Sequence, residues 1–161
     1  MNSILSEAQK EFMREAISLS LESINKGGGP FGAVIVKDGK RISGSSNTVT
    51  IDSDPTAHAE VNAIRKACKT LNTFDLSGCE IYTSCEPCPM CLAAIYWARI
   101  DIIYYGNTKE DARKIGFDDE FIYSEILIEK ENRKIKAIPF LHEESIIPFE
   151  IWDKKENKMK Y

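Results

Sequence analysis

The chain has 161 residues, of which 43% are hydrophobic and 29% are charged, and its 25 acidic side chains outnumber 21 basic ones to give a net charge of −4. This composition is typical of one globular domain with a sizeable core, and it excludes disordered and collagen-like classes. The longest apolar runs, 31–36 and 91–98, are far shorter than the ~18 residues of a membrane span, and charges interrupt the N-terminus where an export signal needs an apolar stretch. We therefore expect a cytoplasmic protein without a membrane partner, and the acidic balance disfavours a nucleic-acid partner.

The cysteine count points to thiol chemistry without disulfides. There are five cysteines and two histidines, and an odd number of cysteines without an export signal argues against a disulfide framework. The thiols are therefore expected to be ligands, nucleophiles or core residues.

The first predicted element is an amphipathic helix over 6–26. Ser6 and Gln9 form a capping-box pattern at its start, and the glycine–proline stretch 27–30 stops it. Six residues recur at helical spacing on its predicted inner face: Phe12, Met13, Ala16, Ile17, Ser20 and Ile24.

Two strands follow, a buried one over 31–36 and a returning one over 41–45, joined by a turn at Asp38 and Gly39. The glycines of the 27–32 stretch also match a GxGxxG pattern. A dinucleotide-binding fingerprint follows a strand and opens a helix, whereas this one follows a helix and opens a strand. We interpret these glycines as a helix stop and a close backbone approach.

The middle of the chain alternates helices and strands. Asp54 and Pro55 predict a helix start, and the chain then gives a strand over 79–84, a helix over 87–98 and a strand over 102–105. The first of these helices turns five residues towards a core: Val61, Ile64, Ala67, Cys68 and Leu71. This alternation predicts an α/β fold, a three-layer α/β/α sandwich with one mixed sheet.

The last third of the chain is less regular. A short helix is predicted over 108–115, then a loop at 116–119, a strand over 134–140 and a terminal helix over 147–158. Because no linker or repeat divides the chain, we expect a single domain over 1–161.

Two segments carry residues with metal chemistry, and each begins a helix. Cys88 and Cys91 are three apart and share a helix face, and Pro87 suits the first helical position. The partial positive charge of a helix N-terminus lowers the thiol pKa and favours the thiolates that a metal requires. On the neighbouring helix, His58 completes a set of one nitrogen and two sulfur ligands.

Three protein ligands leave one position of a tetrahedral zinc ion open, which is typical of a catalytic site. Water bound there has its pKa lowered to about 7. Glu60 is not needed as a ligand, but in the first turn of a helix it can reach the same site and move protons between water and substrate.

Alternatives to this interpretation remain. The CxxC pair alone can be a redox pair, although its context is not thioredoxin-like. A closed structural zinc site would need a fourth ligand, for which Cys85 and His142 are the candidates. We expect both of these, with Cys68 and Cys79, to be structural.

The signature of His58 and Glu60 followed by Pro87, Cys88 and Cys91 is similar to that of zinc nucleobase deaminases. The chain resembles the small bacterial guanine deaminases of the cytidine deaminase-like superfamily. The blocks that carry the resemblance are 28–36, 82–92, 95–99 and 116–119, together with the aromatic C-terminal residue Tyr161.

The resemblance implies one zinc ion held by His58, Cys88 and Cys91, with Glu60 as proton shuttle. It also implies roles for five further residues: Asn47 bonds the purine, Asp119 binds its amino-bearing edge and assists proton transfer, Phe31 and Trp97 wall the base, and Tyr161 closes over it. From the residues alone, the two wall residues can equally be core, Asn47 a turn residue and Tyr161 a frayed end. Which of Asp118 and Asp119 faces the substrate is left open.

The implied reaction is hydrolysis of guanine to xanthine and ammonia, in which zinc-bound hydroxide attacks C2. Deaminases of tRNA adenosine, cytosine, nucleosides or triazines share the zinc site and stay as alternatives, as does a non-catalytic zinc-stabilised interaction subunit. The resemblance further implies a homodimer, in which the C-terminal segment 145–161 closes the active site and can be exchanged between subunits.

Overall fold

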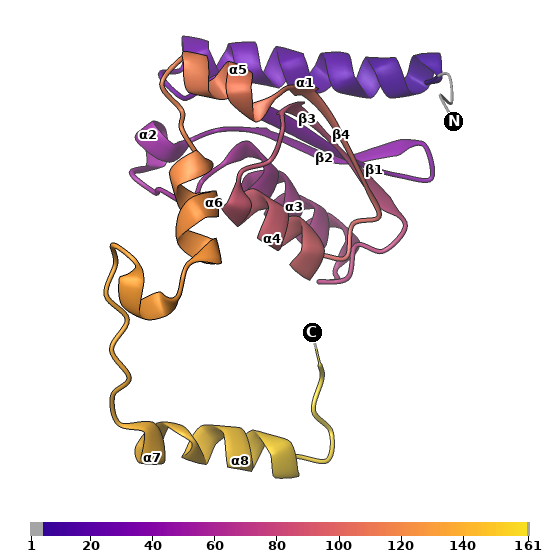
Figure 1. Ribbon diagram of the computed structural model, residues 1–161. Coiled ribbons are helices and arrows are strands. Elements are labelled where there is room, and N and C mark those ends of the chain that lie inside the picture. Colours follow the sequence, from indigo (N-terminus) through magenta and orange to yellow (C-terminus); the bar gives the residue numbers. More distant parts are fainter. Residues whose placement is uncertain (1–4, 161) are drawn as a thin grey trace. The chain divides into compact units, whose positions relative to one another are not determined.

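The computed structural model describes residues 5–160, which divide into two compact units at Asp119 and Glu120. Figure 1 labels the elements along the chain. The first unit contains α1 (Glu7–Asn25), β1 (Gly32–Lys37), β2 (Lys40–Ser46), α2 (Val49–Asp52), α3 (Ala59–Leu71), β3 (Cys79–Cys85), α4 (Pro89–Trp97), β4 (Ile102–Asn107) and α5 (Lys109–Lys114).

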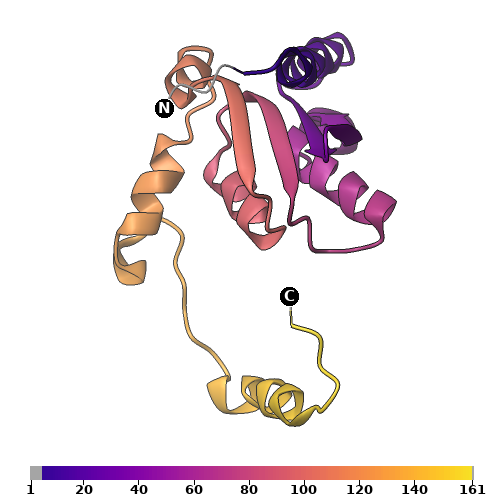
Figure 2. The same cartoon turned by 90° about the vertical axis from the view of Figure 1, so that its right-hand side faces the viewer.

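The first unit is built on a mixed four-stranded sheet with the order β2-β1-β3-β4. Strand β1 is antiparallel to both of its neighbours, whereas β3 and β4 are parallel and joined through α4. Helix α1 covers one face of the sheet, and α3 and α4 lie on the other (Figure 2). The predicted three-layer α/β/α arrangement with a mixed sheet is therefore confirmed.

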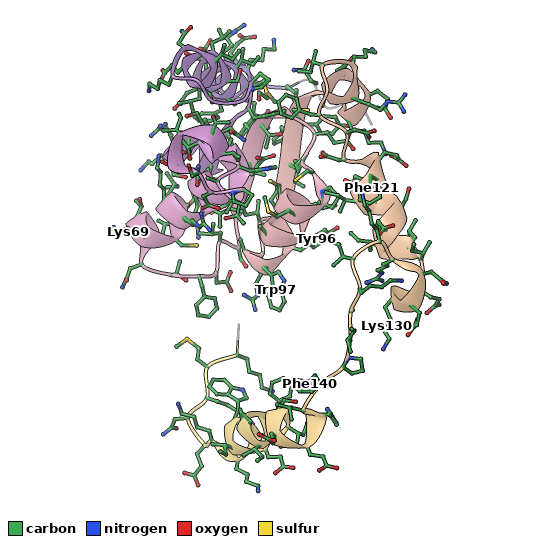
Figure 3. All side chains as sticks on the ribbon, turned by 90° about the vertical axis from the view of Figure 1, so that its left-hand side faces the viewer. Lys69, Tyr96, Trp97, Phe121, Lys130 and Phe140 are labelled. Atoms are coloured by element: carbon green, nitrogen blue, oxygen red, sulfur yellow. The ribbon has the colours of Figure 1, made fainter. Side chains whose placement is uncertain are left out.

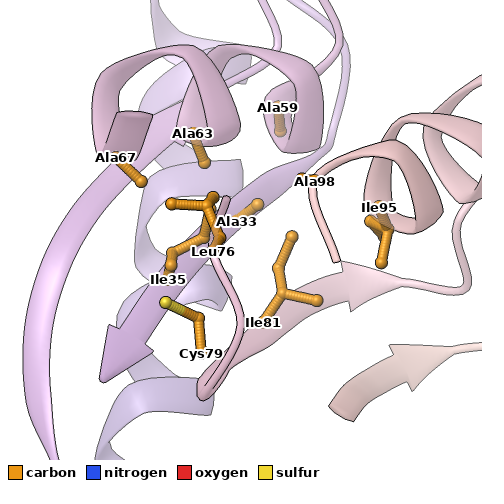
Figure 4. Packing of buried hydrophobic residues seen from close by; sticks show 10 residues of the cluster. All are labelled: Ala33, Ile35, Ala59, Ala63, Ala67, Leu76, Cys79, Ile81, Ile95 and Ala98. Atoms are coloured by element: carbon orange, nitrogen blue, oxygen red, sulfur yellow. The ribbon is translucent and has the colours of Figure 1, made fainter. Parts of the chain in front are cut away.

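Strand β1 holds the layers together because both of its faces are buried. Ala33 and Ile35 point towards α3 and α4, while Val34 and Val36 point towards α1. This explains why its sequence is a continuous apolar run rather than an alternating one. Figure 4 shows the larger cluster, formed by Ala33, Ile35, Ala59, Ala63, Ala67, Leu76, Cys79, Ile81, Ile95 and Ala98.

Helix α1 begins with the predicted capping box and lies very close to the sheet. The Gln9 N–H donates to Ser6 Oγ (3.2 Å), and the Ser6 N–H donates to Gln9 Oε1 (2.9 Å). A Cβ at Gly32 would lie only 2.2 Å from the main-chain oxygen of Ala16. This close approach requires small residues where the helix faces the strand.

The buried face of α1 accordingly differs from the predicted one. Ala16, Ser20 and Ser23 are buried, whereas Ile17 and Ile24 are exposed. The predicted inner face is therefore right for Phe12 and Met13, which pack against the core, and wrong for these two isoleucines. Where the helix lies closest to the sheet, only small side chains fit.

The start of α3 also differs from the prediction. Asp54 and Pro55 do not open it: the Asp54 carboxylate accepts a hydrogen bond from the Thr56 N–H (2.8 Å) in a local turn, and the helix begins at Ala59 after the N-cap residue His58. Aspartate followed by proline is as typical of a turn as of a helix start. The shift places His58 at the end of the helix rather than within it.

The second unit contains α6 (Glu120–Leu127), the 3₁₀ helix η1 (Lys130–Asn132), α7 (His142–Ser145) and α8 (Ile147–Lys154). The terminal helix predicted over 147–158 is therefore present but ends earlier. None of the described residues of this unit is buried. Within residues 5–160, no helix is both long and apolar enough to cross a membrane.

The strand predicted over 134–140 is wrong, since these residues form no regular structure. Ile135 and Ile138 are three residues apart and would point to opposite faces of a strand, and Pro139 has no N–H to donate to a neighbour. Ile135, Ile138 and Phe140 are each 82% exposed, and Phe140 is labelled in Figure 3.

Candidate active site

The first turns of α3 and α4 meet at the candidate metal centre. His58 is the N-cap residue of α3 and Cys88 is the N-cap residue of α4, both with extended backbones. Cys91 follows in the first turn of α4, where its N–H donates to the Cys88 sulfur (3.5 Å). Helix α4 begins at Pro89 rather than at the predicted residue 87, so Cys88 stands at the helix terminus itself.

The three predicted ligands come together with spacing that suits zinc. The His58 Nδ1 lies 3.6 Å from Cys88 Sγ and 3.4 Å from Cys91 Sγ, and all three ligand atoms lie within 4.8 Å of one another. Zn–S and Zn–N bonds of ordinary length at a tetrahedral angle require a nitrogen–sulfur separation of about 3.6 Å. The two nitrogen–sulfur distances therefore fit a bound zinc ion.

The electrostatics of the ligands favour a metal-binding state. The hydrogen bond from the Cys91 thiol, with that from His58, lowers the pKa of the Cys88 thiol to about 4. Sharing that proton raises the pKa of Cys91, and the hydrogen bond with Cys88 raises the pKa of His58. The two sulfur atoms and the imidazole thus share protons that a bound cation would replace.

Glu60 lies in the first turn of α3, two residues after His58, and is buried. Burial is the main reason that the pKa of its carboxyl is raised above its ordinary value. A raised pKa makes a carboxyl a better proton acceptor in its ionised form, which suits a group that moves protons in general acid–base catalysis.

A cavity of about 320 Å³ opens beside this centre, and the first unit supplies all of its described lining. Six predicted site residues line it: Phe31, Asn47, His58, Glu60, Cys88 and Asp119. The structure therefore brings two of the predicted ligands, the predicted proton shuttle and three of the predicted base-binding residues into one space.

Asn47 follows strand β2 and is buried with a defined orientation. Its Oδ1 accepts hydrogen bonds from the N–H groups of Val49 (3.2 Å) and Gly29 (3.4 Å). This leaves the Nδ2 group as the donor available to a ligand. Phe31 lies beside Asn47, and its ring packs edge-on against that of Phe117 with centroids 4.9 Å apart.

The loop after α5 brings Asp119 rather than Asp118 to the cavity. Asp119 is half-buried and lines it, while Asp118 is exposed. Burial, followed by the charge of Cys88, raises the pKa of the Asp119 carboxyl.

The structure does not bring Trp97 into the cavity of its own chain. Its side chain is 66% exposed at the end of α4, beside the exposed Tyr96, as Figure 3 shows. Together with Ala93 and Arg99, these two residues line a separate surface hollow. This differs from the prediction that the indole walls the base, because Trp97 is the last residue of α4, at the end opposite to Cys88 and Cys91. Tyr161 lies outside the described residues.

Sequence reasoning gave no role in the cavity to Glu86 and Phe117, and it expected Cys85, which also lines the cavity, to be structural. The Glu86 carboxylate accepts a hydrogen bond from the Lys109 N–H (3.2 Å) and so links the cysteine loop to the first residue of α5. Its place between two cysteines of the motif was a signal for such a role. Phe117 lies in a block noted only for its resemblance.

Comparison with known proteins agrees with this geometry. Residues 6–107 match the model of the cytidine and deoxycytidylate deaminase zinc-binding region. The chain belongs to this family.

Two similar proteins carry names with different substrates. Guanine deaminase of Bacillus subtilis (strain 168) is 52% identical over 151 residues, which are 93% of this chain and 97% of the relative. The tRNA-specific adenosine deaminase of Aquifex aeolicus (strain VF5) is 45% identical over 94 residues, which are 58% of this chain and 62% of the relative. The X-ray structure of the Bacillus subtilis guanine deaminase superposes with a TM-score of 0.91 at 52% identity, covering 94% of this chain and 98% of that one.

Proposed function

We propose that this deaminase hydrolyses guanine to xanthine and ammonia, with one zinc ion held by His58, Cys88 and Cys91. The observation that carries the proposal is the buried Glu60 beside these three ligands, in a cavity that also presents Asn47. The 52% identity to a guanine deaminase extends along 93% of the chain and supports guanine as the substrate.

The zinc ion, when bound, supplies Lewis acidity that activates water for attack on carbon 2 of the base. Glu60 performs the proton transfers: its carboxylate takes a proton from the attacking water and delivers it to ring nitrogen N3. It then carries the second proton to the amino group, which leaves as ammonia when the C2–N bond breaks. The raised pKa of Glu60 suits a group that must both accept and donate.

Asn47 and Phe31 are proposed to hold the base. Because the Asn47 Oδ1 is occupied by main-chain donors, its Nδ2 donates to an acceptor on the purine. The Phe31 ring, supported by Phe117, forms an apolar wall. A buried donor that must be paired rejects bases without a matching acceptor more strongly than an apolar wall does.

Asp119 is proposed to bind the amino-bearing edge of the purine and to assist proton transfer. Its carboxylate lies on the cavity and accepts hydrogen bonds in its ionised form. Its raised pKa makes the carboxylate a better proton acceptor, which suits a role beside the departing amine.

We further propose a homodimer in which the C-terminal segment 145–161 of one copy covers the cavity of the other, with Tyr161 closing over the base. The unit from Glu120 exposes apolar side chains and buries none of its described residues, so it requires a surface to pack against. Trp97 and Tyr96 on the exposed face of α4 suit the contact between subunits.

The test of this function is incubation of the purified, zinc-loaded protein with guanine while xanthine and ammonia are measured. Stoichiometric formation of both products supports the proposal. An absence of turnover with zinc bound would exclude guanine as the substrate. It would leave a non-catalytic zinc-stabilised subunit as the alternative if other bases also failed.

The second candidate is deamination of adenosine in tRNA, which the 45% identity to a tRNA-specific adenosine deaminase favours. That similarity covers only 58% of the chain, and the net charge of −4 provides little attraction for phosphates. Inosine formation in tRNA, with binding that weakens steeply as salt rises, would support this candidate over guanine.

A cytoplasmic location and a role in purine metabolism accompany the proposal. The cysteines that the structure describes are all free thiols, as is usual in a reducing compartment. Separation of cell fractions followed by an assay for guanine turnover tests the location.

A further inference from the structure

A buried hydroxyl outside the predicted site reaches the residue proposed to hold the base. Ser23 lies in the last turn of α1 and is fully buried. Its Oγ donates a hydrogen bond of 2.7 Å to the main-chain oxygen of Asn47, which is 24 residues further along the chain. The bond therefore ties the end of α1 to the residue that follows β2.

Main-chain groups supply the other hydrogen bonds of Asn47. Its N–H donates to the Phe31 oxygen (3.0 Å), and its Oδ1 accepts from the N–H groups of Val49 and Gly29. Among the hydrogen bonds that described residues make with Asn47, the bond from Ser23 alone comes from another side chain. A substitution at Ser23 can therefore remove one of the restraints on Asn47 and leave the main-chain partners in place.

The loop after α1 packs tightly over this hydrogen bond. The Gly28 N–H donates to the Ser23 oxygen (2.8 Å). A Cβ at Gly28 would lie 2.4 Å from Ser23 Oγ and 2.5 Å from the Asn47 oxygen. The absence of a side chain at Gly28 thus lets the loop cover the bond, and Ser23 holds both the loop and Asn47.

We propose that Ser23 is a positioning residue, which fixes the main chain of Asn47 so that the Nδ2 donor of its side chain faces the bound base. The inference rests on the proposed function, in which Asn47 binds guanine. Because Asn47 contacts the base and not the carbon that reacts, a loss of positioning weakens substrate binding more than it slows the chemical step. Ser23 itself does not touch the substrate.

The experiment compares Ser23→Ala with Ser20→Ala in the zinc-loaded enzyme. Ser20 is a matched control because it is also buried on the inner face of α1, one turn earlier, and its Oγ donates to the Ile17 oxygen of the same helix (2.7 Å). We expect Ser23→Ala to raise the KM for guanine about tenfold and to change kcat less than about threefold. We expect Ser20→Ala to change neither.

Two further variants separate positioning from a general structural role. Ser23→Cys keeps a side chain of similar size but offers a weaker donor, so its KM should lie between those of the wild type and Ser23→Ala. In the Asn47→Ala background, Ser23→Ala should raise KM no further, since the side chain that it positions is gone. Zinc content and melting temperature are measured for every variant.

Three results would overturn the inference: a KM of Ser23→Ala equal to that of Ser20→Ala, a fall in kcat and zinc content with KM unchanged, or a further rise of KM in the double variant. If Ser23→Ala does not fold, the KM of Ser23→Cys is decisive: a raised KM supports positioning, and a KM equal to that of the wild type contradicts it. If the wild-type enzyme does not turn over guanine, the proposed function is overturned, and the inference that rests on it is overturned as well.

Discussion

The two units of the molecule differ in what they bury. In the unit that ends at Asp119, strand β1 is covered on both faces and two apolar clusters form around it. In the unit from Glu120, no described residue is buried, and even the apolar side chains of Ile138 and Phe140 are each 82% exposed. The first unit therefore has a core of its own, whereas the second has apolar surface and no buried residue among those described.

The candidate catalytic residues and the segment proposed to cover them belong to different units. His58, Glu60 and Cys88 stand on the first turns of two helices that pack against the sheet, so their geometry is set by rigid elements. The segment proposed to cover the site, 145–161, belongs to the unit without a core. Four measurements address this contrast: one on the catalytic carboxyl, one on the core, one on the segment proposed as the cover and one on the helix that precedes Asp119.

The largest expected effect is on catalysis and concerns the first unit alone. Glu60→Gln keeps the shape of the side chain but cannot carry a proton, so kcat for guanine should fall about 10²–10⁴-fold while zinc content stays near one ion per chain. Steady-state kinetics and metal analysis measure both quantities. Loss of zinc from this variant would show that Glu60 supports the metal instead.

The second effect is on stability and compares matched isoleucines of the two units. Ile35→Ala removes a fully buried side chain from the core and should lower the free energy of unfolding by about 2–5 kcal/mol. Ile138→Ala should change it by less than about 0.5 kcal/mol in the monomer. Urea denaturation at a protein concentration low enough to keep the chain monomeric measures both. An equal loss of unfolding free energy in the two variants would show that the two units do not differ in their cores.

The third effect is on assembly and concerns the second unit. If the proposed dimer forms through segment 145–161, removal of these residues should leave a monomer and raise the KM for guanine about tenfold, the size expected for the loss of an aromatic contact with the base. Gel filtration and kinetics measure these changes, and Tyr161→Ala separates the contact from the assembly. Unchanged mass and activity would count against the exchanged segment.

The smallest effect concerns the start of α5, which precedes the loop that carries Asp119. The Asp111 carboxylate accepts hydrogen bonds from the Thr108 N–H (3.1 Å) and Oγ1 (2.8 Å), and these lower its pKa from 3.8 to about 2. Its contribution to stability is therefore complete above pH 3.8 and is lost as the pH falls through about 2. Asp111→Asn should lower the melting temperature slightly at pH 6 and not at pH 2. Glu110→Gln, in the same exposed turn, serves as the control, and a difference that persists at pH 2 would argue against the charge as its cause.

The metal ligands could be predicted from the sequence because their geometry is local. Cys88 and Cys91 lie within one helical turn, where a spacing of three places two sulfur atoms on the same side. His58 and Glu60 likewise lie at the start of one helix, from which both reach the same space. The resemblance to a known deaminase then indicated Asn47, Phe31 and Asp119 as cavity residues, which the residues alone left open.

The predictions that failed depend on whether one element contacts another. Ile17 and Ile24 have helical spacing, yet the close approach of α1 to the sheet turns them outwards. The segment 134–140 has the composition of a strand, yet its apolar spacing does not alternate and it forms no ladder. Trp97 lies on the correct helix for the site but near the end opposite to the ligands.

The sequence by itself indicated the candidate zinc ligands, the acidic residue Glu60 beside them and the α/β plan, because the periodicities of helices and strands fix which residues of one element lie together. Tertiary structure alone decided which elements meet: it placed Ser23 on the main chain of Asn47, Asp119 rather than Asp118 on the cavity, and Trp97 outside it. The physical reason is that backbone packing between elements depends on the combined size of side chains from distant parts of the chain, which no local pattern records.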